Sequence, residues 1–261
     1  MEKNLIPLPL LSELPSSVYL RHDEFGADSH SAPHSHAWGQ LNYVSSGVMA
    51  LNIAGQRFLS PPQYGVWIPP NFEHSCYNRE AVVYRSLYVA VEHCQVLPGQ
   101  PCTLMISDIL KAILHDFAER DVKIPESERD RRLAQVLLDQ LQSAKVQTRY
   151  LPYAESGGLH AVMTALQSSP GDNRTLAEWA TQVNVSERTL ARQCLRELGM
   201  SFGDWRQRLR FLSSIQALDK GMTVQEVAFD MGYSSASAFI AMFQREAGCT
   251  PDQYRRQARR V

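Results

Sequence analysis

The sequence predicts an α+β protein of two domains, with a small β-barrel and two helices in the first domain and only helices in the second. Three observations lead to this prediction. Short aromatic and β-branched runs recur at a spacing of roughly ten residues, amphipathic helical patterns follow them, and the last third of the chain repeats a helical segment. With 261 residues and 44% hydrophobic content, the chain is long enough to bury both cores.

The first domain is expected over residues 1–150, and its barrel over about 19–95. The expected strands are QLNYVSSG, VMALNIAG, QRFLS, YGVWIPP and AVVYRSLYVAV, which are separated by turn residues such as Gly, Pro, Asn and Ser. Evenly spaced short strands of this composition are typical of a small barrel or jelly roll.

Two amphipathic helices are expected after the barrel, over about residues 104–145. Apolar residues follow helical spacing twice, at Ile106, Ile109, Leu110, Ile113, Leu114 and Phe117, and again at Leu133, Val136, Leu137 and Leu141. These stripes either pack on the barrel or form a homodimer interface, and the two roles are compatible.

A domain boundary is expected in KVQTRYLPYAESGG, which contains a proline and a glycine pair. The whole chain has a formal net charge of −1. From Leu159 onward, however, 13 Lys and Arg stand against 10 Asp and Glu. This small basic excess is a weak indication of a polyanionic partner for the second domain.

The N-terminal segment MEKNLIPLPLLSELPSSVYL is apolar but interrupted by prolines, and it has neither a basic start nor a bilayer-spanning run. The five cysteines lack CxxC spacing, which argues against a disulfide framework and a cysteine zinc site. We therefore expect a cytoplasmic protein with reduced thiols and no membrane partner.

The second domain, expected over residues 159–256, contains two similar segments, TLAEWATQVNVS from Thr175 and TVQEVAFDMGYS from Thr223. Each copy has a small residue for a close helix crossing, then a residue that tolerates positive φ, then a serine that can cap the next helix. These are Ala180, Asn184 and Ser186 in the first copy and Ala228, Gly232 and Ser234 in the second. The pattern is that of a helix-turn-helix, whose second helix enters the DNA major groove; the units are expected over about 176–198 and 224–247.

The second helix of each unit is the expected reader of bases. In SERTLARQCLREL, the residues expected on the buried face are Leu190, Cys194, Leu195 and Leu198. The candidate DNA-binding residues are Ser186, Arg188, Thr189, Arg192 and Gln193. Arginine reads guanine through two hydrogen bonds, whereas the second copy offers only Ser235, Ala236, Ser237 and Ala241. We therefore expect the first unit to provide most of the discrimination.

The stretch FGDWRQRLRFLSSIQALDKG predicts one long helix between the two units. Its arginines Arg206, Arg208 and Arg210 pair with nearby acids or contact phosphates, and at least one of them is expected on a solvated face. Arg206 is a candidate DNA-binding residue. A rigid connector would place the units on two successive major-groove faces, one turn of DNA apart.

The segments VSERTLARQCLRELGMSFGDWRQRLR and VAFDMGYSSASAFIAMFQREAGCTPDQYR resemble the DNA-binding domain of the AraC/XylS family of bacterial transcriptional regulators. The resemblance covers about residues 159–256 and includes the closing motif from Gly248 to Arg255. It implies seven helices, promoter binding at direct repeats and a separate effector-binding domain. The base-contact positions that it carries over are Arg188, Ala191 and Arg192 in the first unit and Ala236, Ser237 and Ala241 in the second.

HSHAWGQLNYVSSG and PPNFEHSCYN resemble the two motifs of the cupin barrel, whose metal-binding members supply two histidines and a glutamate from the first and a histidine from the second. The corresponding residues here are His34, His36, Gln40 and His74. Residues two apart on a strand face the same way, so His34 and His36 can meet His74 from a neighbouring strand. Imidazoles suit Zn, Ni, Cu or Fe, but the neutral Gln40 amide is a weaker ligand than a carboxylate.

Three interpretations of these histidines remain open. They hold a divalent transition metal with Gln40 as a fourth ligand, or they hydrogen-bond an organic effector or each other, or they form an enzyme's metal centre. The aromatic residues nearby in sequence either line an effector pocket together with Gln40 or pack in the core. They are Trp38, Tyr43, Trp67, Phe72 and Tyr77.

We interpret the sequence as a ligand-responsive transcriptional regulator, not an enzyme, with a cupin-like (jelly-roll) β-barrel, packing or dimerisation helices, and an all-α double helix-turn-helix domain. Its expected partners are double-stranded promoter DNA, a small-molecule effector and a second copy of the chain, with no cofactor required. The alternatives are a dioxygenase-like cupin metalloenzyme with a helical appendage and a helical adaptor that binds no DNA.

Overall fold

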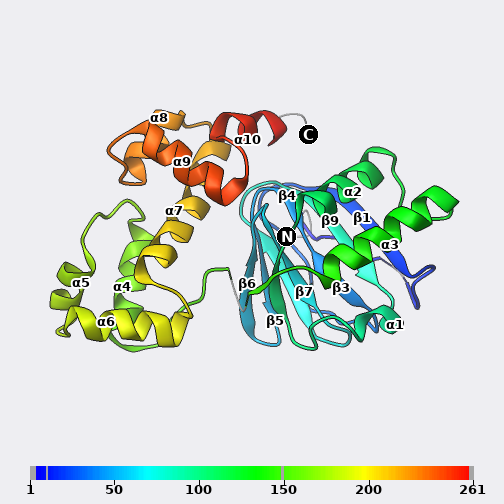
Figure 1. The fold of residues 1–261 in the computed structure, drawn as a ribbon, viewed down its shortest axis with the longest axis horizontal. Coiled ribbons are helices and arrows are strands. Elements are labelled where there is room, and N and C mark those ends of the chain that lie inside the picture. Colours follow the sequence, from blue (N-terminus) through cyan, green and yellow to red (C-terminus); the bar gives the residue numbers. More distant parts are fainter. Residues whose placement is uncertain (1–3, 10, 148–149, 259–261) are drawn as a thin grey trace. The chain divides into compact units, whose positions relative to one another are not determined.

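The computed structural model describes residues 4–9, 11–147 and 150–258 (Figure 1). The chain divides into two compact units, one ending at Tyr150 and the other starting at Leu151. The division falls within KVQTRYLPYAESGG. In the described part of the chain, no helix combines the length and the apolar character that crossing a membrane requires.

The first unit contains two antiparallel β-sheets. The larger has the strand order β1-β9-β3-β7-β10-β11, with β4 also pairing with β9, and the smaller has the order β2-β8-β5-β6. The strands are β1 (Val18–Phe25), β2 (Ser29–His30), β3 (Gly39–Asn42), β4 (Val44–Ser46), β5 (Met49–Ile53), β6 (Gln56–Ser60), β7 (Tyr64–Ile68), β8 (His74–Asn78), β9 (Val82–Val89), β10 (Cys102–Met105) and β11 (Val146–Gln147). The predicted runs therefore form strands, and their pairing brings distant histidines to one place.

The larger sheet is covered on both faces. Val66 and Ile68 of β7 pack in a cluster with residues of the smaller sheet, such as Leu51. Trp67, between them, packs in a second cluster with residues of two helices, such as Phe117. Burial on both faces explains why YGVWIPP reads as a continuous apolar run instead of an alternating one.

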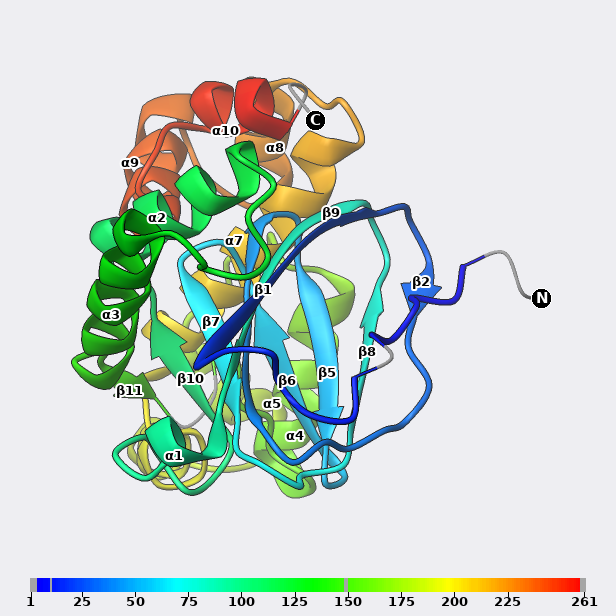
Figure 2. The same cartoon turned by 90° about the vertical axis from the view of Figure 1, so that its right-hand side faces the viewer.

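The two helices that cover this sheet are α2 (Asp108–Glu119) and α3 (Glu128–Gln142), which lie side by side in Figure 2. The predicted start at about residue 104 was wrong, because Cys102–Met105 pairs with β7 as β10. Ser107 then caps α2 by accepting a hydrogen bond from the Leu110 N–H. Ile106 lies in the connection between β10 and α2, outside the helix. It is apolar because it is buried there, and its position matches the helical spacing by coincidence. A short helix, α1 (Val91–Cys94), follows β9.

The second unit has seven α-helices within its described residues. They are α4 (Gly157–Ser168), α5 (Leu176–Gln182), α6 (Glu187–Gln193), α7 (Phe202–Asp219), α8 (Val224–Asp230), α9 (Ala236–Ala247) and α10 (Pro251–Ala258), and a π-helical turn, η1 (Cys194–Leu198), continues α6. In Figure 1, α7 runs from the group formed by α4, α5 and α6 to the group formed by α8, α9 and α10.

The sequence repeat corresponds to two similar helix pairs, α5–α6 and α8–α9. Thr175 and Thr223 each form a capping box with the glutamate three residues later, which starts α5 and α8 in the same way. Asn184 and Gly232 both adopt the predicted positive φ, at 56° and 77°. The local sequence of each copy is therefore sufficient to build the first helix and the turn.

Candidate nucleic-acid interface and histidine cluster

Helix α6 presents two arginines on its exposed face. Ser186 caps the helix by accepting a hydrogen bond from the Thr189 N–H at 3.2 Å. Arg188 and Arg192, one helical turn apart, are exposed, and within the described residues neither guanidinium has a partner. Thr189 and Gln193 are only half exposed. The helix therefore offers two free, bidentate hydrogen-bond donors to a ligand such as a base edge.

The buried face of this helix differs from the prediction at one position. Leu190, Cys194 and Leu198 are buried as expected, but Leu195 is 60% exposed. The π-helical turn over Cys194–Leu198 changes the rotation between successive residues, so that Leu195 turns outward while Leu198 reaches the core.

Helix α9 begins one residue later than the repeat predicts. Ser234 was expected to be the cap, but Ser235 accepts the hydrogen bond from the Ala238 N–H at 3.2 Å. The side chain that fills the core is Phe239, which is fully buried, whereas the position matching Leu190 is the small and exposed Ala238. The helix starts later because this start brings Phe239, rather than Ala238, into the core.

The two serines at this turn provide a test of the corrected start. We expect Ser235→Ala to lower the free energy of unfolding by about 1 kcal/mol, because an N–H at the helix start loses its acceptor. Ser234→Ala, the matched control, should change it by less than about 0.5 kcal/mol. Chemical denaturation monitored by circular dichroism measures both, and equal effects of the two substitutions would contradict this assignment.

The exposed face of α9 has a different chemical character from that of α6. Ser237 and Ala241 are exposed, Ala236 is half-buried, and the hydroxyl of Ser235 is used as the cap. Gln244 and Arg245 continue the exposed stripe toward the end of the helix. The sequence interpretation missed these two polar residues, although their helical spacing from Ser237 and Ala241 would have indicated them.

Arg206, the candidate from α7, makes most of its contacts within the protein. Its Nη1 donates to the backbone oxygen of Arg174 at 2.8 Å, and its guanidinium lies 5.2 Å from the centre of the Phe202 ring. Partial burial lowers the pKa of Arg206. Of the predicted DNA-binding residues, Arg188 and Arg192 of α6 and Ser237 of α9 lie exposed on their helices.

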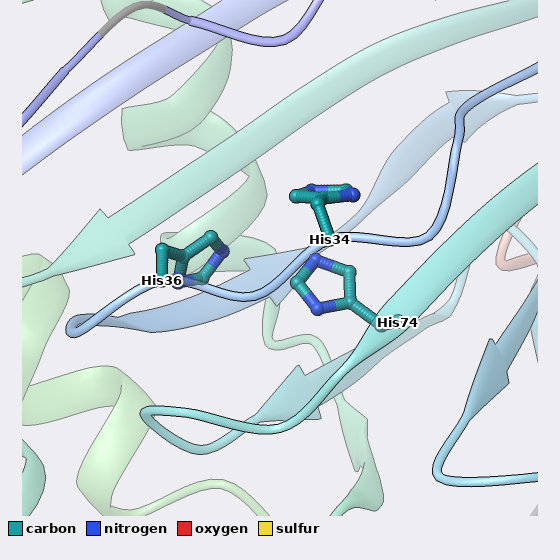
Figure 3. A group of neighbouring side chains, drawn as sticks. All are labelled: His34, His36 and His74. Carbon is teal, nitrogen blue, oxygen red and sulfur yellow. The ribbon is translucent and has the colours of Figure 1, made fainter.

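The structure brings the three predicted histidines together (Figure 3). His34 and His74 exchange two backbone hydrogen bonds, of 2.9 and 3.0 Å, which hold the chain before β3 against the start of β8. The ring centroids of His34 and His74 are 4.2 Å apart, and those of His36 and His74 are 5.0 Å apart. One ring nitrogen of each histidine lies within 4.8 Å of the others.

Backbone contacts orient all three rings in the same way. The Nδ1 atoms of His34, His36 and His74 lie 2.8–2.9 Å from the backbone oxygens of Ala32, Trp38 and Phe72. A carbonyl oxygen only accepts, so each Nδ1 carries the hydrogen and each Nε2 of a neutral ring has a lone pair. Burial lowers the pKa of His36, and it lowers the pKa of His74 to about 3, which keeps both rings neutral. The site is a set of three imidazole electron-pair donors.

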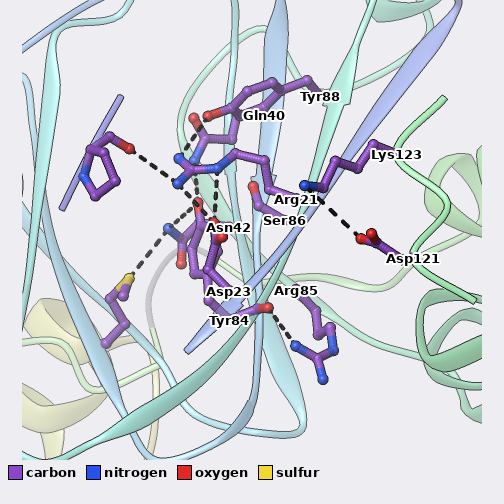
Figure 4. Close-up of polar contacts among 12 residues, drawn as sticks. Arg21, Asp23, Gln40, Asn42, Tyr84, Arg85, Ser86, Tyr88, Asp121 and Lys123 are labelled. Atoms are coloured by element: carbon purple, nitrogen blue, oxygen red, sulfur yellow. Dashed lines mark hydrogen bonds and ion pairs between the residues drawn. The ribbon is translucent and has the colours of Figure 1, made fainter. Parts of the chain in front are cut away.

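Gln40 lies between these donors and a buried tyrosine. Its Oε1 is 3.0 Å from Nε2 of His36 and 3.2 Å from Nε2 of His74. Its Nε2 donates to the hydroxyl of Tyr84 at 3.1 Å, and Figure 4 shows this contact. Burial raises the pKa of Tyr84, so its hydroxyl stays protonated. In this orientation an amide oxygen faces two nitrogen lone pairs, which repel it unless a cation lies among them.

A second orientation of the amide would satisfy the same atoms without a cation. If the amide is rotated by half a turn, its NH₂ group donates to both histidines and its oxygen accepts from Tyr84, because the two ends of an amide have nearly the same shape. The first two interpretations of the cluster thus correspond to two orientations of Gln40.

The predicted aromatic residues separate into two places. Trp38 stacks on His36 with a ring-centroid distance of 4.7 Å, and its indole N–H is buried without a partner among the described atoms. Tyr43 and Trp67 lie instead in the core beneath α2 and α3, with Trp67 donating to the backbone oxygen of Pro98. Trp67 of β7 and Tyr43, between β3 and β4, lie on the helix-covered face, which the sequence did not distinguish from the histidine face.

Tyr84 and Tyr88 of β9 complete the surroundings of the histidines and were not predicted. Tyr88 lies 5.5 Å from His36 between ring centroids, and its hydroxyl accepts a hydrogen bond from Arg21 Nη1 at 3.4 Å. Arg21 is also paired with Asp23 at 2.8 Å, as Figure 4 shows. The alternation of positions 84, 86 and 88 on one strand face was the signal that would have placed both tyrosines here.

Both units match known families. A family model described as a helix-turn-helix domain matches residues 179–257, and one described as an AraC-like ligand binding domain matches residues 16–142. The chain is 35% identical over 231 residues to the HTH-type transcriptional regulator NimR of Escherichia coli, which covers 88% of this chain and 84% of that protein.

Two further likenesses are more limited. The HTH-type transcriptional regulator RipA of Corynebacterium glutamicum is 35% identical over 94 residues, 36% of this chain and 28% of RipA. The crystal structure of ToxT from Vibrio cholerae aligns with a TM-score of 0.39 and 12% identity, over 92% of this chain and 97% of that one.

Proposed function

Because the chain belongs to the AraC family of HTH-type transcriptional regulators, we propose that it binds promoter DNA through α6 and α9 together, under the control of a ligand at the histidine cluster. Membership of this family is the evidence for DNA binding. The two-helix contact, the ligand, the homodimer and the absence of catalysis are the further parts of this proposal.

The observation that carries the DNA contact is the pair of similar helix-turn-helix units with exposed second helices, of which the first presents the free guanidiniums of Arg188 and Arg192. A salt titration on DNA selected from a random library tests it. We expect selected DNA to bind at least about 1,000-fold more tightly than unrelated DNA, with affinity falling steeply as salt rises. Equal affinity for all sequences would contradict the proposal.

The proposed ligand site is a transition-metal centre formed by His34, His36 and His74, with Gln40 Oε1 as the fourth donor. Three imidazoles, each with one ring nitrogen within 4.8 Å of the others, suit Zn²⁺, Ni²⁺ or Cu²⁺. The backbone contacts at Nδ1 fix the tautomer of each ring, as the outer contacts of metal-bound histidines usually do. A metal held by these residues would supply positive charge that attracts an effector's lone pair.

The metal centre serves in sensing rather than in catalysis. Its fourth donor is a neutral amide, and the orphan indole N–H of Trp38 beside His36 offers a hydrogen bond to an effector's acceptor atom. An effector controls DNA occupancy only through its different affinities for the DNA-competent and DNA-incompetent states of the chain. Thermal shift with metal salts and metabolites identifies it, because a ligand stabilises the state that it binds.

The proposed homodimer forms through the groove between α2 and α3, a hollow of about 480 Å³. Ile109 and Val136 line it and are 54% and 41% exposed. Asp116, which also lines the groove, is already paired within the chain with Arg120 at 2.7 Å and with Arg129 at 3.5 Å. The exposed apolar floor therefore favours a second copy of the chain as the occupant, because two such faces related by a two-fold axis would cover each other.

We expect Val136→Asp to raise the dimer dissociation constant about tenfold, because it places a charge in an apolar interface. The control Val96→Asp alters an equally apolar side chain that is 66% exposed in the same unit, outside the groove. Sedimentation velocity over a concentration series measures both. A wild-type protein that remains monomeric at high concentration would contradict the interface.

A further inference from the structure

Arg210 of α7 is an arginine buried to 8% exposure, and the hydrogen bonds of its guanidinium go to backbone and amide oxygens rather than to carboxylates. Its Nε donates to the oxygen of Pro170 at 3.0 Å. Its Nη2 donates to the oxygen of Asp172 at 3.0 Å and to Oδ1 of Asn173 at 2.8 Å. All three acceptors belong to the loop between α4 and α5. Helix α7 is therefore hydrogen-bonded to the loop that leads into the first helix-turn-helix unit. Pairing with nearby acids, a phosphate contact and a solvated face were the roles expected from the sequence, and none of them describes this buried residue.

Asn173 connects the loop before α5 to the second helix-turn-helix unit, α8–α9. Its Nδ2 donates to the backbone oxygen of Gly232 at 2.8 Å, while its Oδ1 accepts from Arg210. Gly232 is the positive-φ residue of the turn between α8 and α9. The ring of Tyr233, the next residue, lies 5.5 Å from the Arg210 guanidinium. One amide therefore joins the loop before α5 to the turn before α9.

Two glycines allow the loop and the turn to approach this closely. A Cβ on Gly171 would overlap the backbone oxygen of Asp230, and a Cβ on Gly232 would overlap the backbone oxygen of Gly171. Two backbones in direct contact leave no flexible side chain between them to absorb a relative movement. The contact is thus stiffer than one made through long side chains would be.

We propose that Gly171, Asn173, Arg210 and Gly232 form a lock that holds α6 and α9 at one fixed separation and rotation, and thereby sets the spacing of the two DNA half-sites that the chain accepts. Without the lock, the two units are joined through α7, an 18-residue helix about 27 Å long. A single helix held only at its ends bends and twists. The lock adds a second connection between the units, beside the helix, which suppresses this movement.

The consequence for DNA recognition follows from geometry. Inserting one base pair between half-sites moves the second by about 3.4 Å and rotates it by about 34°. If α6 and α9 are held rigidly, they cannot adjust to the new separation and rotation of the half-sites. If their connection is loosened, they can. Rigidity also raises the effective concentration of the second helix at its half-site once the first is bound, so loosening should weaken binding to the best spacing.

The test uses the full chain and double-stranded oligonucleotides that the wild-type protein selects from a random library. Affinities are measured for the selected site and for the same site with one or two base pairs inserted between its halves. We expect insertion to weaken wild-type binding at least about tenfold, and to weaken Gly171→Ala less than about threefold. Asn173→Ala should act in the same direction without adding volume. The matched control is Gly203→Ala in α7, where a Cβ meets only ordinary contact at 3.7 Å.

Melting temperatures and circular dichroism identify variants that remain folded, and Asn173→Ala keeps the test available if Gly171→Ala does not fold. If folded lock variants lose as much affinity on base-pair insertion as the wild type does, the proposed lock is wrong. The proposal that α6 and α9 both contact DNA would then still stand. This inference rests on that contact. A wild-type protein that selects only one half-site would instead contradict the contact itself, and the lock with it.

Discussion

Replacing His74 with alanine is expected to weaken transition-metal binding by about 100-fold or more, the largest effect predicted for this protein. His74 is 3% exposed and its ring lies close to both other histidines, so no neighbouring group can take its place. Its burial lowers the pKa and keeps the ring neutral, and its Nδ1 contact with the Phe72 oxygen directs Nε2 at the site. Isothermal titration with Zn²⁺, Ni²⁺ and Cu²⁺ measures the loss.

The control is His115→Ala, which removes an imidazole from the exposed surface of α2 and should leave metal affinity unchanged. Gln40→Glu should strengthen binding, because a carboxylate neutralises part of the ion's charge. If the wild type binds none of these metals, the Gln40 amide donates to the histidines and the cluster is not a metal site. If His34→Ala leaves metal content, effector response and DNA binding untouched, the histidines have only a structural role.

Replacing Arg192 with alanine is expected to lower affinity for the best DNA site about 10- to 100-fold, and to relax the preference at one or two base positions. Arg192 is exposed and has no partner among the residues that the structure describes, so its loss should remove the proposed DNA contact without disturbing the core of the helix-turn-helix unit. Binding selection with randomised DNA, at one stated salt concentration, reports affinity and preference together.

Arg196→Ala is the matched control for this substitution. Arg196 follows Arg192 by four residues but lies in the π-helical turn and pairs with Glu197 at 2.6 Å. Its replacement should weaken binding to all sequences slightly and equally, if at all. A uniform loss from Arg192→Ala, with base preferences unchanged, would reduce Arg192 to a phosphate contact and remove its proposed role as a reader.

The repeated unit was readable from sequence because its determinants are local. Thr175 and Thr223 each start a helix through a capping box, and Asn184 and Gly232 each supply the positive φ of the turn. Such signals act within a few residues and need no distant partner. The start of α9 was misplaced because the choice between Ser234 and Ser235 depends on which side chain reaches the core, and that is a tertiary matter.

The histidine site shows the same division. The sequence indicated His34, His36, Gln40 and His74 through their resemblance to the two cupin motifs, although the segment with His34 and His36 precedes β3 instead of forming a regular strand. It did not indicate Tyr84 and Tyr88, or that Trp67 lies on the opposite face, because these depend on how β3, β7 and β9 pair.

By itself, the sequence determined the two-unit organisation, the strand and helix repeats, and the candidate residues of the proposed DNA contact and of the histidine cluster. Only the tertiary structure decided that Gln40 joins His74 and Tyr84, and that Arg210 and Asn173 join the two helix-turn-helix units. The physical reason is range. Capping, turn conformation and periodicity act between near neighbours, whereas these contacts join residues far apart in the chain and exist only after the cores have packed.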